Sequence, residues 1–155
     1  MPRIAILGGG LCGRLTALQL AEQGLSVALF DKGGRKGENA AAYVAAAMLA
    51  PAAEAVEATP EVIKLGRQSI PLWRNIRGRL KTPTMMQENG SLIVWHGQDK
   101  PLSGEFVRHL KRGGVADDEI VRWHANDIAE REPQLGGRFS DGLYLPTEGQ
   151  LDGRQ

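Results

Sequence analysis

The chain has 155 residues, of which 42% are apolar and 24% charged, so it can bury a core and is not a disordered, collagen-like or fibrous sequence. Its 19 basic and 18 acidic residues leave a net charge of +1, which gives no electrostatic reason to expect nucleic acid or an anionic membrane surface as a partner. The single cysteine, Cys12, excludes an internal disulfide and is typical of a reducing compartment. The longest uncharged stretch, residues 39–53, is too short to cross a bilayer, so we predict a cytoplasmic protein with no integral membrane segment.

The first 31 residues predict a βαβ unit. Residues 3–7 are short, apolar and β-branched, as in a buried strand. The helix predicted over residues 11–23 is followed by Gly24, where a helix commonly ends. Residues 25–30 are again continuously apolar, which is typical of a parallel sheet covered on both faces.

The loop between the first strand and the helix carries a phosphate-binding pattern. Gly8, Gly10 and Gly13 form G-x-G-x-x-G, and Asp31 ends the next strand. The first glycine permits a tight turn, the second lets a pyrophosphate approach the backbone, and the third lets helix and strand pack closely. Asp31 is placed to accept hydrogen bonds from a ribose hydroxyl, and its charge disfavours a 2′-phosphate and hence NADP. The alternative is a glycine turn without a ligand.

Other reactive residue types give weaker signals. Cys12 is read as a small side chain near the phosphates rather than as a reactive thiol, although a helix N-terminus can lower a thiol pKa. The basic loop after Asp31 is expected to be solvated, with an adenosine contact as the alternative. No metal site and no catalytic acid or base is predicted. The three histidines are expected at the surface and lack the spacing of a metal pair: His96, His109 and His124.

Residues 40–50 are rich in alanine and are predicted to form a helix that ends at Pro51. Such a segment is either a tightly packed helix or a place where small side chains let a large flat ligand approach. A second helix is predicted from residue 59 to about residue 80, with proline at its first position.

The rest of the chain predicts an α+β piece. Asn89-Gly90 predicts a hairpin between residues 84–88 and 91–96. A helix is expected over residues 101–112, a helical turn over 126–131 and a strand over 142–145, and residues 118–124 are ambiguous. We therefore predict two parts, a dinucleotide-binding portion over residues 1–82 and a partial substrate-domain segment over residues 83–155.

Longer stretches resemble one family. The stretch IAILGGGLCGRLTALQLAEQGLSVALFDKG, then AAAMLAP, GSLIVWHGQDKPL and EREPQLGGRFSDGLYLPTEGQLDGRQ, resembles the N-terminal part of the FAD-dependent D-amino acid oxidase superfamily, in its glycine oxidase branch associated with thiamine synthesis. The likeness covers nearly the whole chain in the same motif order. It implies an α/β fold, with a Rossmann-like FAD-binding βαβ unit and an inserted α+β substrate-domain portion.

The resemblance implies FAD as the cofactor, held by the glycine turn, the acid after the second strand and the alanine-rich segment. Carried over by position, the implied cofactor residues are Gly8, Gly10, Leu11, Cys12, Gly13, Asp31, Lys32, Ala41, Ala42, Ala46, Ala47 and Met48. Two departures stand out. The family often has hydroxyl residues where this chain has Ala41, Ala42 and Tyr43, and usually has glycine where this chain has Ala47.

The resemblance also implies a function. We expect the complete protein to oxidise the amine of glycine or a small D-amino acid to an imine by hydride transfer to flavin, with a small amino acid as its partner and a homo-oligomer as a possible state. Family members continue well beyond residue 155, so this chain is expected to be truncated. The alternatives are a non-catalytic dinucleotide-binding fragment, a flavoenzyme of the same superfamily acting on another amine, and an NAD-dependent dehydrogenase, which the alanine-rich segment and the motif order disfavour.

Overall fold

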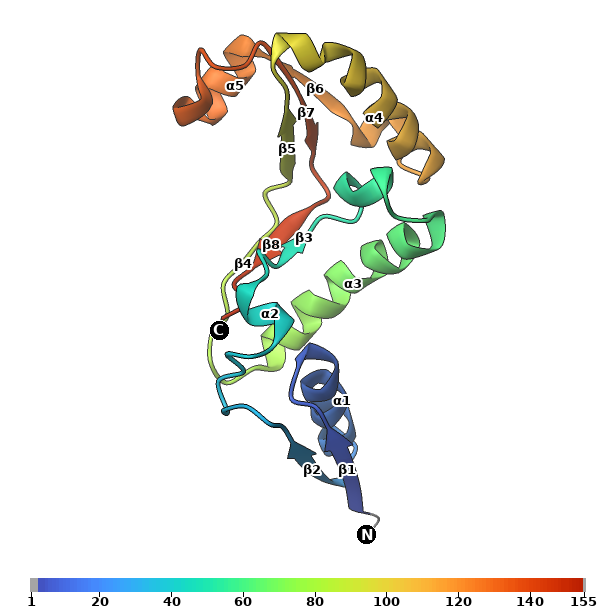
Figure 1. Ribbon diagram of the computed structural model, residues 1–155, viewed down its shortest axis with the longest axis vertical. Coiled ribbons are helices and arrows are strands. Elements are labelled where there is room, and N and C mark those ends of the chain that lie inside the picture. Colours follow the sequence, from blue (N-terminus) through green and yellow to red (C-terminus); the bar gives the residue numbers. More distant parts are fainter. Residues whose placement is uncertain (1–2, 155) are drawn as a thin grey trace. The chain divides into compact units, whose positions relative to one another are not determined.

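The computed structural model describes residues 3–154, which form two compact units (Figure 1). The first unit comprises the chain up to Ala47 together with the residues from Asp152 onward, and the second runs from Met48 to Leu151. These units differ in extent from the predicted division at residue 82. That division concerned cofactor and substrate functions, and it stays a prediction.

The first unit contains the predicted βαβ arrangement. Strand β1 (Arg3–Leu7), helix α1 (Leu11–Glu22) and strand β2 (Ser26–Phe30) follow one another, and the two strands pair in parallel (Figure 1). A short helix, α2 (Ala41–Val44), completes the unit. Helix α1 ends as predicted, because Gly24 adopts a φ of 79° and lets the Leu25 amide donate to the Leu20 carbonyl at 3.1 Å.

The two faces of the β1–β2 sheet differ in exposure. Ile4 and Ile6 are half-buried on one face, and Ile6 lies close to Gly13 of α1. On the opposite face, Leu7 pairs with Phe30, and these side chains are 84% and 55% exposed. Within this unit the expected covering of both faces is therefore absent, because its described residues supply a helix to one face only.

The second unit contains two antiparallel sheets, three α-helices and four short 3₁₀ helices. Its elements are β3 (Met48–Leu49), α3 (Pro60–Arg79), β4 (Met86–Gln87), β5 (Ser91–Val94), α4 (Lys100–Arg112), β6 (Val121–His124), α5 (Ala125–Arg131), β7 (Asp141–Leu145) and β8 (Gly149–Leu151). The strand orders are β3-β8-β4 and β5-β7-β6. The ambiguous stretch 118–124 thus contributes a strand, and the helices predicted near residues 59–80, 101–112 and 126–131 are confirmed.

The core of the second unit lies where α3 and α4 meet β7. Ile63 and Leu110 are 1% and 0% exposed, and burial of such a side chain stabilises a fold by roughly 1.5–3 kcal/mol. The buried cluster consists of Ala52, Ala55, Ile63, Leu110, Val115 and Leu145. Its alanines come from the segment just after Pro51, so small side chains there allow close packing against α3 and α4.

The helix predicted over residues 40–50 is wrong for most of its length. Only Ala41–Val44 are helical, Ala45 is extended with a ψ of 150°, and Met48 and Leu49 form strand β3. The helix has already ended at Ala45, and Ala47, with a φ of 52° in the left-handed region, keeps the chain from resuming it. Alanine content favours a helix locally, but pairing of β3 with β8 overrides that preference.

The hairpin predicted at Asn89-Gly90 is also wrong. Strand β4 pairs with β8 and strand β5 pairs with β7, so both partners come from the end of the chain. Gly90 has a φ of 78°, and its amide donates to the Glu148 carbonyl at 2.9 Å. The dipeptide therefore directs the chain from one sheet to the other, a use of the left-handed conformation that the local sequence does not distinguish from a hairpin turn.

Candidate cofactor site

The glycine turn joins β1 to α1 in the tight geometry that its sequence predicts. Gly8 has a φ of 110°, which side-chain-bearing residues rarely adopt, and its amide continues the parallel pairing by donating to the Phe30 carbonyl at 2.7 Å. A Cβ atom on Gly13 would overlap the Gly8 carbonyl oxygen. Gly8 and Gly13 are therefore required by the backbone itself.

Gly10 has a different reason to be glycine. It is the N-cap residue of α1, and a Cβ atom there would meet nothing within 4 Å. The first-turn amides of a helix lack intrahelical acceptors and carry partial positive charge, and no side chain caps them here. The open space beside these amides is of the kind that admits a diphosphate group.

Asp31 ties the glycine turn to the end of β2. Its Oδ2 accepts a hydrogen bond from the Gly9 amide at 2.6 Å, and its Oδ1 accepts one from the Gly33 amide at 2.7 Å. The hydrogen bond from Gly9, then that from Gly33, and the nearby positive charges of Arg14 and Lys32 lower the pKa of the Asp31 carboxyl group. Asp31 is therefore ionised at neutral pH, and each oxygen can accept a further hydrogen bond.

This arrangement predicts a pH-dependent contribution of Asp31 to stability. Because its pKa in the folded chain lies below the ordinary value of 3.8, the contribution is present above that pH and is lost as the pH falls through the folded value. We expect Asp31→Asn to unfold at a lower temperature than the unmodified chain near neutral pH, and the gap to close below pH 3.8. Thermal unfolding followed by circular dichroism across this range measures the gap, with Asp118→Asn in the second unit as the matched control. A gap that persists in acid would contradict the role of the charged carboxylate.

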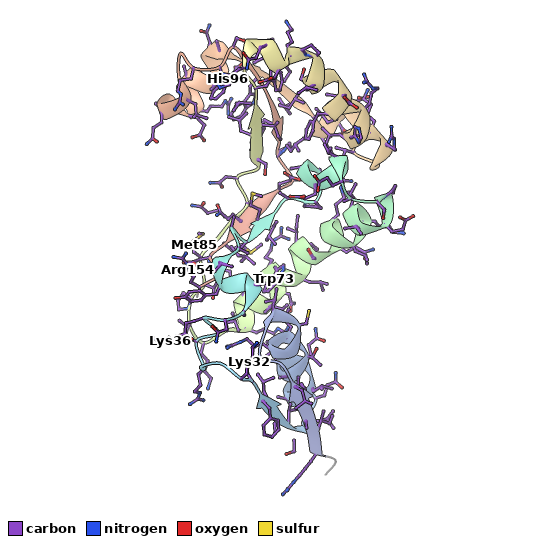
Figure 2. All side chains as sticks on the ribbon, in the orientation of Figure 1. Lys32, Lys36, Trp73, Met85, His96 and Arg154 are labelled. Atoms are coloured by element: carbon purple, nitrogen blue, oxygen red, sulfur yellow. The ribbon has the colours of Figure 1, made fainter. Side chains whose placement is uncertain are left out.

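Arg14 is a part of the site that the sequence reasoning missed. Its Nε donates to the Gly9 carbonyl at 2.6 Å and its Nη2 donates to the Arg35 carbonyl at 2.8 Å. It thereby joins the glycine turn to the loop after β2, whose residues Lys32 and Lys36 are labelled in Figure 2. Gly9 was missed as well, although it is buried between Asp31 and Arg14. Neither the glycine pattern nor the charge count pointed to these two residues.

The alanine-rich segment of this unit, residues 41–47, lies against Gly153 and Arg154. A Cβ atom on Gly153 would lie 2.5 Å from the Ala42 carbonyl oxygen, so the two stretches of backbone are close together. Arg154 donates from Nε to the Tyr43 carbonyl at 3.3 Å. The segment is therefore held by a part of the chain that is distant in sequence.

Ala47 is the one described non-glycine residue with a positive φ, and its value of 52° makes a further prediction. A left-handed conformation costs an L-residue about 1–2 kcal/mol, and glycine avoids this cost while gaining freedom in the unfolded chain. We expect Ala47→Gly to raise the free energy of unfolding by a net ~0.5–1 kcal/mol in urea titrations. Ala45→Gly is the control and is expected to lower it, because Ala45 is already extended. Equal effects of the two substitutions would exclude strain at Ala47.

Comparison with known proteins places the chain in a family. The sequence profile of the DAO family, described as FAD dependent oxidoreductase, matches residues 3–155. The chain belongs to this family. It is 34% identical over 155 residues to a putative thiamine biosynthesis oxidoreductase, ThiO, from Rhizobium etli, covering 99% of this chain and 43% of that protein.

Solved structures share the fold of this chain. A glycine oxidase from Geobacillus kaustophilus matches with a TM-score of 0.78 and 23% identity over 99% of this chain and 42% of its own. An L-α-glycerophosphate oxidase from Mycoplasma pneumoniae with FAD bound matches with a TM-score of 0.74 and 16% identity over 99% of this chain and 40% of its own. The chain thus spans less than half of each relative's length.

The DAO-family assignment agrees with the geometry of the turn. The open space at Gly10, the uncapped amides of α1 and the ionised Asp31 fit a cofactor built on a diphosphate and a ribose. The structure brings together the glycine turn and Asp31, and it places Lys32 directly after them. Ala41, Ala42, Ala46 and Ala47 lie in the same compact unit, whereas Met48 begins β3 in the second unit with a 59% exposed side chain.

Among residues 3–154, no group of three or more metal-ligating side chains is close enough to hold a metal ion, and no helix is long and apolar enough to cross a membrane. An open hollow of about 570 Å³ in the second unit lies between α3 and Gly113-Gly114. Its lining includes Lys64 and Arg67 and none of the predicted cofactor residues, so it is not part of the candidate site.

Proposed function

We propose that this chain is the cofactor-binding part of an FAD-dependent oxidoreductase that oxidises the amine of glycine or a small D-amino acid. Membership of the DAO family supports a flavin cofactor, and the likeness to ThiO and to a glycine oxidase supports a small amine-bearing substrate. The single observation that carries the proposal is the glycine turn, with open space at Gly10 beside a carboxylate held in place at Asp31.

Each part of the turn has a distinct task in this proposal. The amides of Leu11, Cys12 and Gly13 donate to the diphosphate, and the N-terminal partial charge of α1 offsets its negative charge. Asp31 accepts hydrogen bonds from the adenosine ribose hydroxyls through the lone pairs that Gly9 and Gly33 leave free. The Asp31 carboxylate is also hydrogen-bonded to the turn through Gly9. This hydrogen bond fixes the distance between the group that binds the diphosphate and the group that binds the ribose.

The alanine-rich segment has the second task. In this proposal Ala41, Ala42, Ala46 and Ala47 present little side-chain volume, which lets the cofactor approach the backbone, and Met48 borders the flavin. The hydroxyls that the family often carries at positions 41–43 are absent, so backbone amides take over any hydrogen bonds to phosphate. When bound, FAD supplies a two-electron acceptor that takes a hydride from the α-carbon of the amine and leaves an imine for water to hydrolyse.

The cofactor part of this proposal is tested by titrating the purified chain with FAD and with NAD⁺. We expect FAD to bind, seen as quenching of its fluorescence and as yellow protein after gel filtration, with NAD⁺ binding much more weakly. A chain that stays colourless and binds neither cofactor, or that prefers NAD⁺, would overturn the proposal.

The substrate part is tested on a protein that carries this chain together with the remaining length of a DAO-family enzyme. Glycine, sarcosine, D-alanine and D-proline are compared for peroxide release, and glycine or D-alanine is expected to react fastest. A preference for sarcosine or D-proline would favour the alternative of another amine. Flavin binding without turnover of any amine would favour a non-catalytic binding role.

A further inference from the structure

The residues Asp152–Arg154 make a three-point contact with helix α2. Arg154 Nε donates to the Tyr43 carbonyl at 3.3 Å, across 111 positions of sequence, and its guanidinium carbon lies 5.6 Å from the centroid of the Tyr43 ring. Gly153 approaches the Ala42 carbonyl, and the Asp152 Oδ1 accepts the Arg154 amide at 2.9 Å. Figure 2 labels Arg154 among the side chains near α2.

Helix α2 needs an external contact of this kind. It has four residues, and a helix that short is not stable by itself. The free energy lost in fixing the first turn exceeds the free energy gained from the hydrogen bonds of that turn. No side chain caps its N-terminus, and the Tyr43 carbonyl lies in its last turn, where helical carbonyls lack intrahelical donors. The Arg154 guanidinium supplies a donor at that end and a positive charge that suits the negative end of the helix.

The side chains of the segment offer few anchors of their own. Residues 41, 42 and 45–47 are all alanine, so Tyr43 carries the only side-chain hydroxyl between Ala40 and Met48. The guanidinium of Arg154 lies over the aromatic ring of Tyr43, and the ring attracts the positive charge electrostatically. One anchor of this segment therefore lies more than a hundred residues away in sequence, at Arg154.

We propose that Arg154 is a positioning residue that holds residues 41–47 in the conformation that receives the cofactor. This inference rests on the proposed function, because it assigns to Arg154 an effect on FAD through Tyr43 rather than a contact with FAD. It also accounts for a segment in which Tyr43 carries the only side-chain hydroxyl. With so few polar side chains in the segment, its polar contacts with a cofactor come from backbone groups, which must be held in place.

The first arm of the test measures the tether without any cofactor. Hydrogen exchange is followed by mass spectrometry on peptides covering residues 40–48, in Arg154→Ala and in Arg138→Ala. Arg138 is a matched control, because its guanidinium lies over the Phe139 ring at 6.0 Å in the second unit. We expect exchange of these peptides to be about tenfold faster in Arg154→Ala and unchanged in Arg138→Ala. The increase corresponds to the loss of one hydrogen bond from a charged donor. Equal exchange in the two variants would overturn the inference, whatever the chain binds.

The second arm measures the consequence for the cofactor. We expect the Kd for FAD to rise about tenfold in Arg154→Ala, to rise less in Arg154→Lys, which keeps a cation over the ring, and to stay unchanged in Arg138→Ala. Unaltered FAD affinity in Arg154→Ala, with the unmodified chain binding FAD, would overturn the inference and leave the proposed function standing. Failure of the unmodified chain to bind FAD would overturn the proposed function and with it the role toward the cofactor, and the first arm still decides whether Arg154 holds the segment.

Discussion

Substitution of Gly13 by alanine is expected to unfold the first unit and to abolish binding of FAD. The added Cβ atom would overlap the Gly8 carbonyl oxygen, which belongs to the backbone and cannot rotate away. Helix α1 would have to separate from β1, at a cost of about 3 kcal/mol, the upper end of the range for overpacked cores. Urea unfolding followed by circular dichroism measures the loss of stability, and fluorescence titration with FAD measures the loss of binding.

Gly10→Ala is the matched control for that experiment. The same methyl group at position 10 enters open space, so the free energy of unfolding is expected to change by less than about 1 kcal/mol. The affinity for FAD is expected to fall at least tenfold, because the methyl group occupies space that the diphosphate needs. If Gly10→Ala bound FAD as well as the unmodified chain, the turn would not be the diphosphate site. If Gly13→Ala were as stable as Gly10→Ala, the close approach of α1 to β1 would be wrong.

Substitution of Glu148 by alanine is expected to cost about 3 kcal/mol of stability in the second unit. Glu148 is 1% exposed, and its Oε1 accepts hydrogen bonds from the amides of Ala52 and Ala53 at 2.7 and 2.9 Å. Without this acceptor, the buried amide of Ala52 and the half-buried amide of Ala53 lose their partner at the start of the helical turn Ala53–Val56, and a cavity remains. Chemical unfolding monitored by tryptophan fluorescence measures the loss, since Trp123 lies in this unit's core.

Two further variants separate the acceptor from the charge at Glu148. Glu148→Gln keeps one oxygen that can accept from the two amides. Its side-chain nitrogen takes the position of Oε2, which has no hydrogen-bond partner. We therefore expect a loss of only about 1 kcal/mol in the free energy of unfolding. Glu130→Ala removes an exposed carboxylate in the same unit and is expected to change stability by less than about 0.5 kcal/mol. A loss in Glu148→Ala no larger than in Glu130→Ala would show that the amides of Ala52 and Ala53 find other partners.

The Glu148 contact explains why two of the family-like stretches occur together. The stretch AAAMLAP ends at Pro51, directly before the two amides that Glu148 accepts, and Glu148 begins the stretch EGQLDGR. Strand β3 of the first stretch also pairs with β8 of the second. The two stretches are distant in the chain, but strand pairing and the Glu148 hydrogen bonds join them in the fold. This contact gives a physical reason for finding both motifs in one sequence.

Local sequence determined the βαβ unit and the ends of its helix. The pattern of strand, glycine turn and helix can be predicted from neighbouring residues alone. Gly8 and Gly24, which have positive φ values, lie next to the elements that they connect. The long helices α3 and α4 were predictable for the same reason, because a helix forms its hydrogen bonds within four residues. Asp31 was identified from its place after β2, and its contact with Gly9 confirms that it lies at the turn.

Tertiary structure alone decided the pairing of the short strands and the anchors of the alanine-rich segment. Asn89-Gly90 and the run of alanines carry strong local preferences for a hairpin and a helix, yet β7 and β8 return from the end of the chain to pair with strands on either side. Arg14, Glu148 and Arg154 act through hydrogen bonds to backbone carbonyls and amides, which any sequence possesses. Backbone groups are the same in nearly every residue, so a pattern of residue types cannot predict such contacts. Only the folded chain shows which backbone groups lie within hydrogen-bond distance of these side chains.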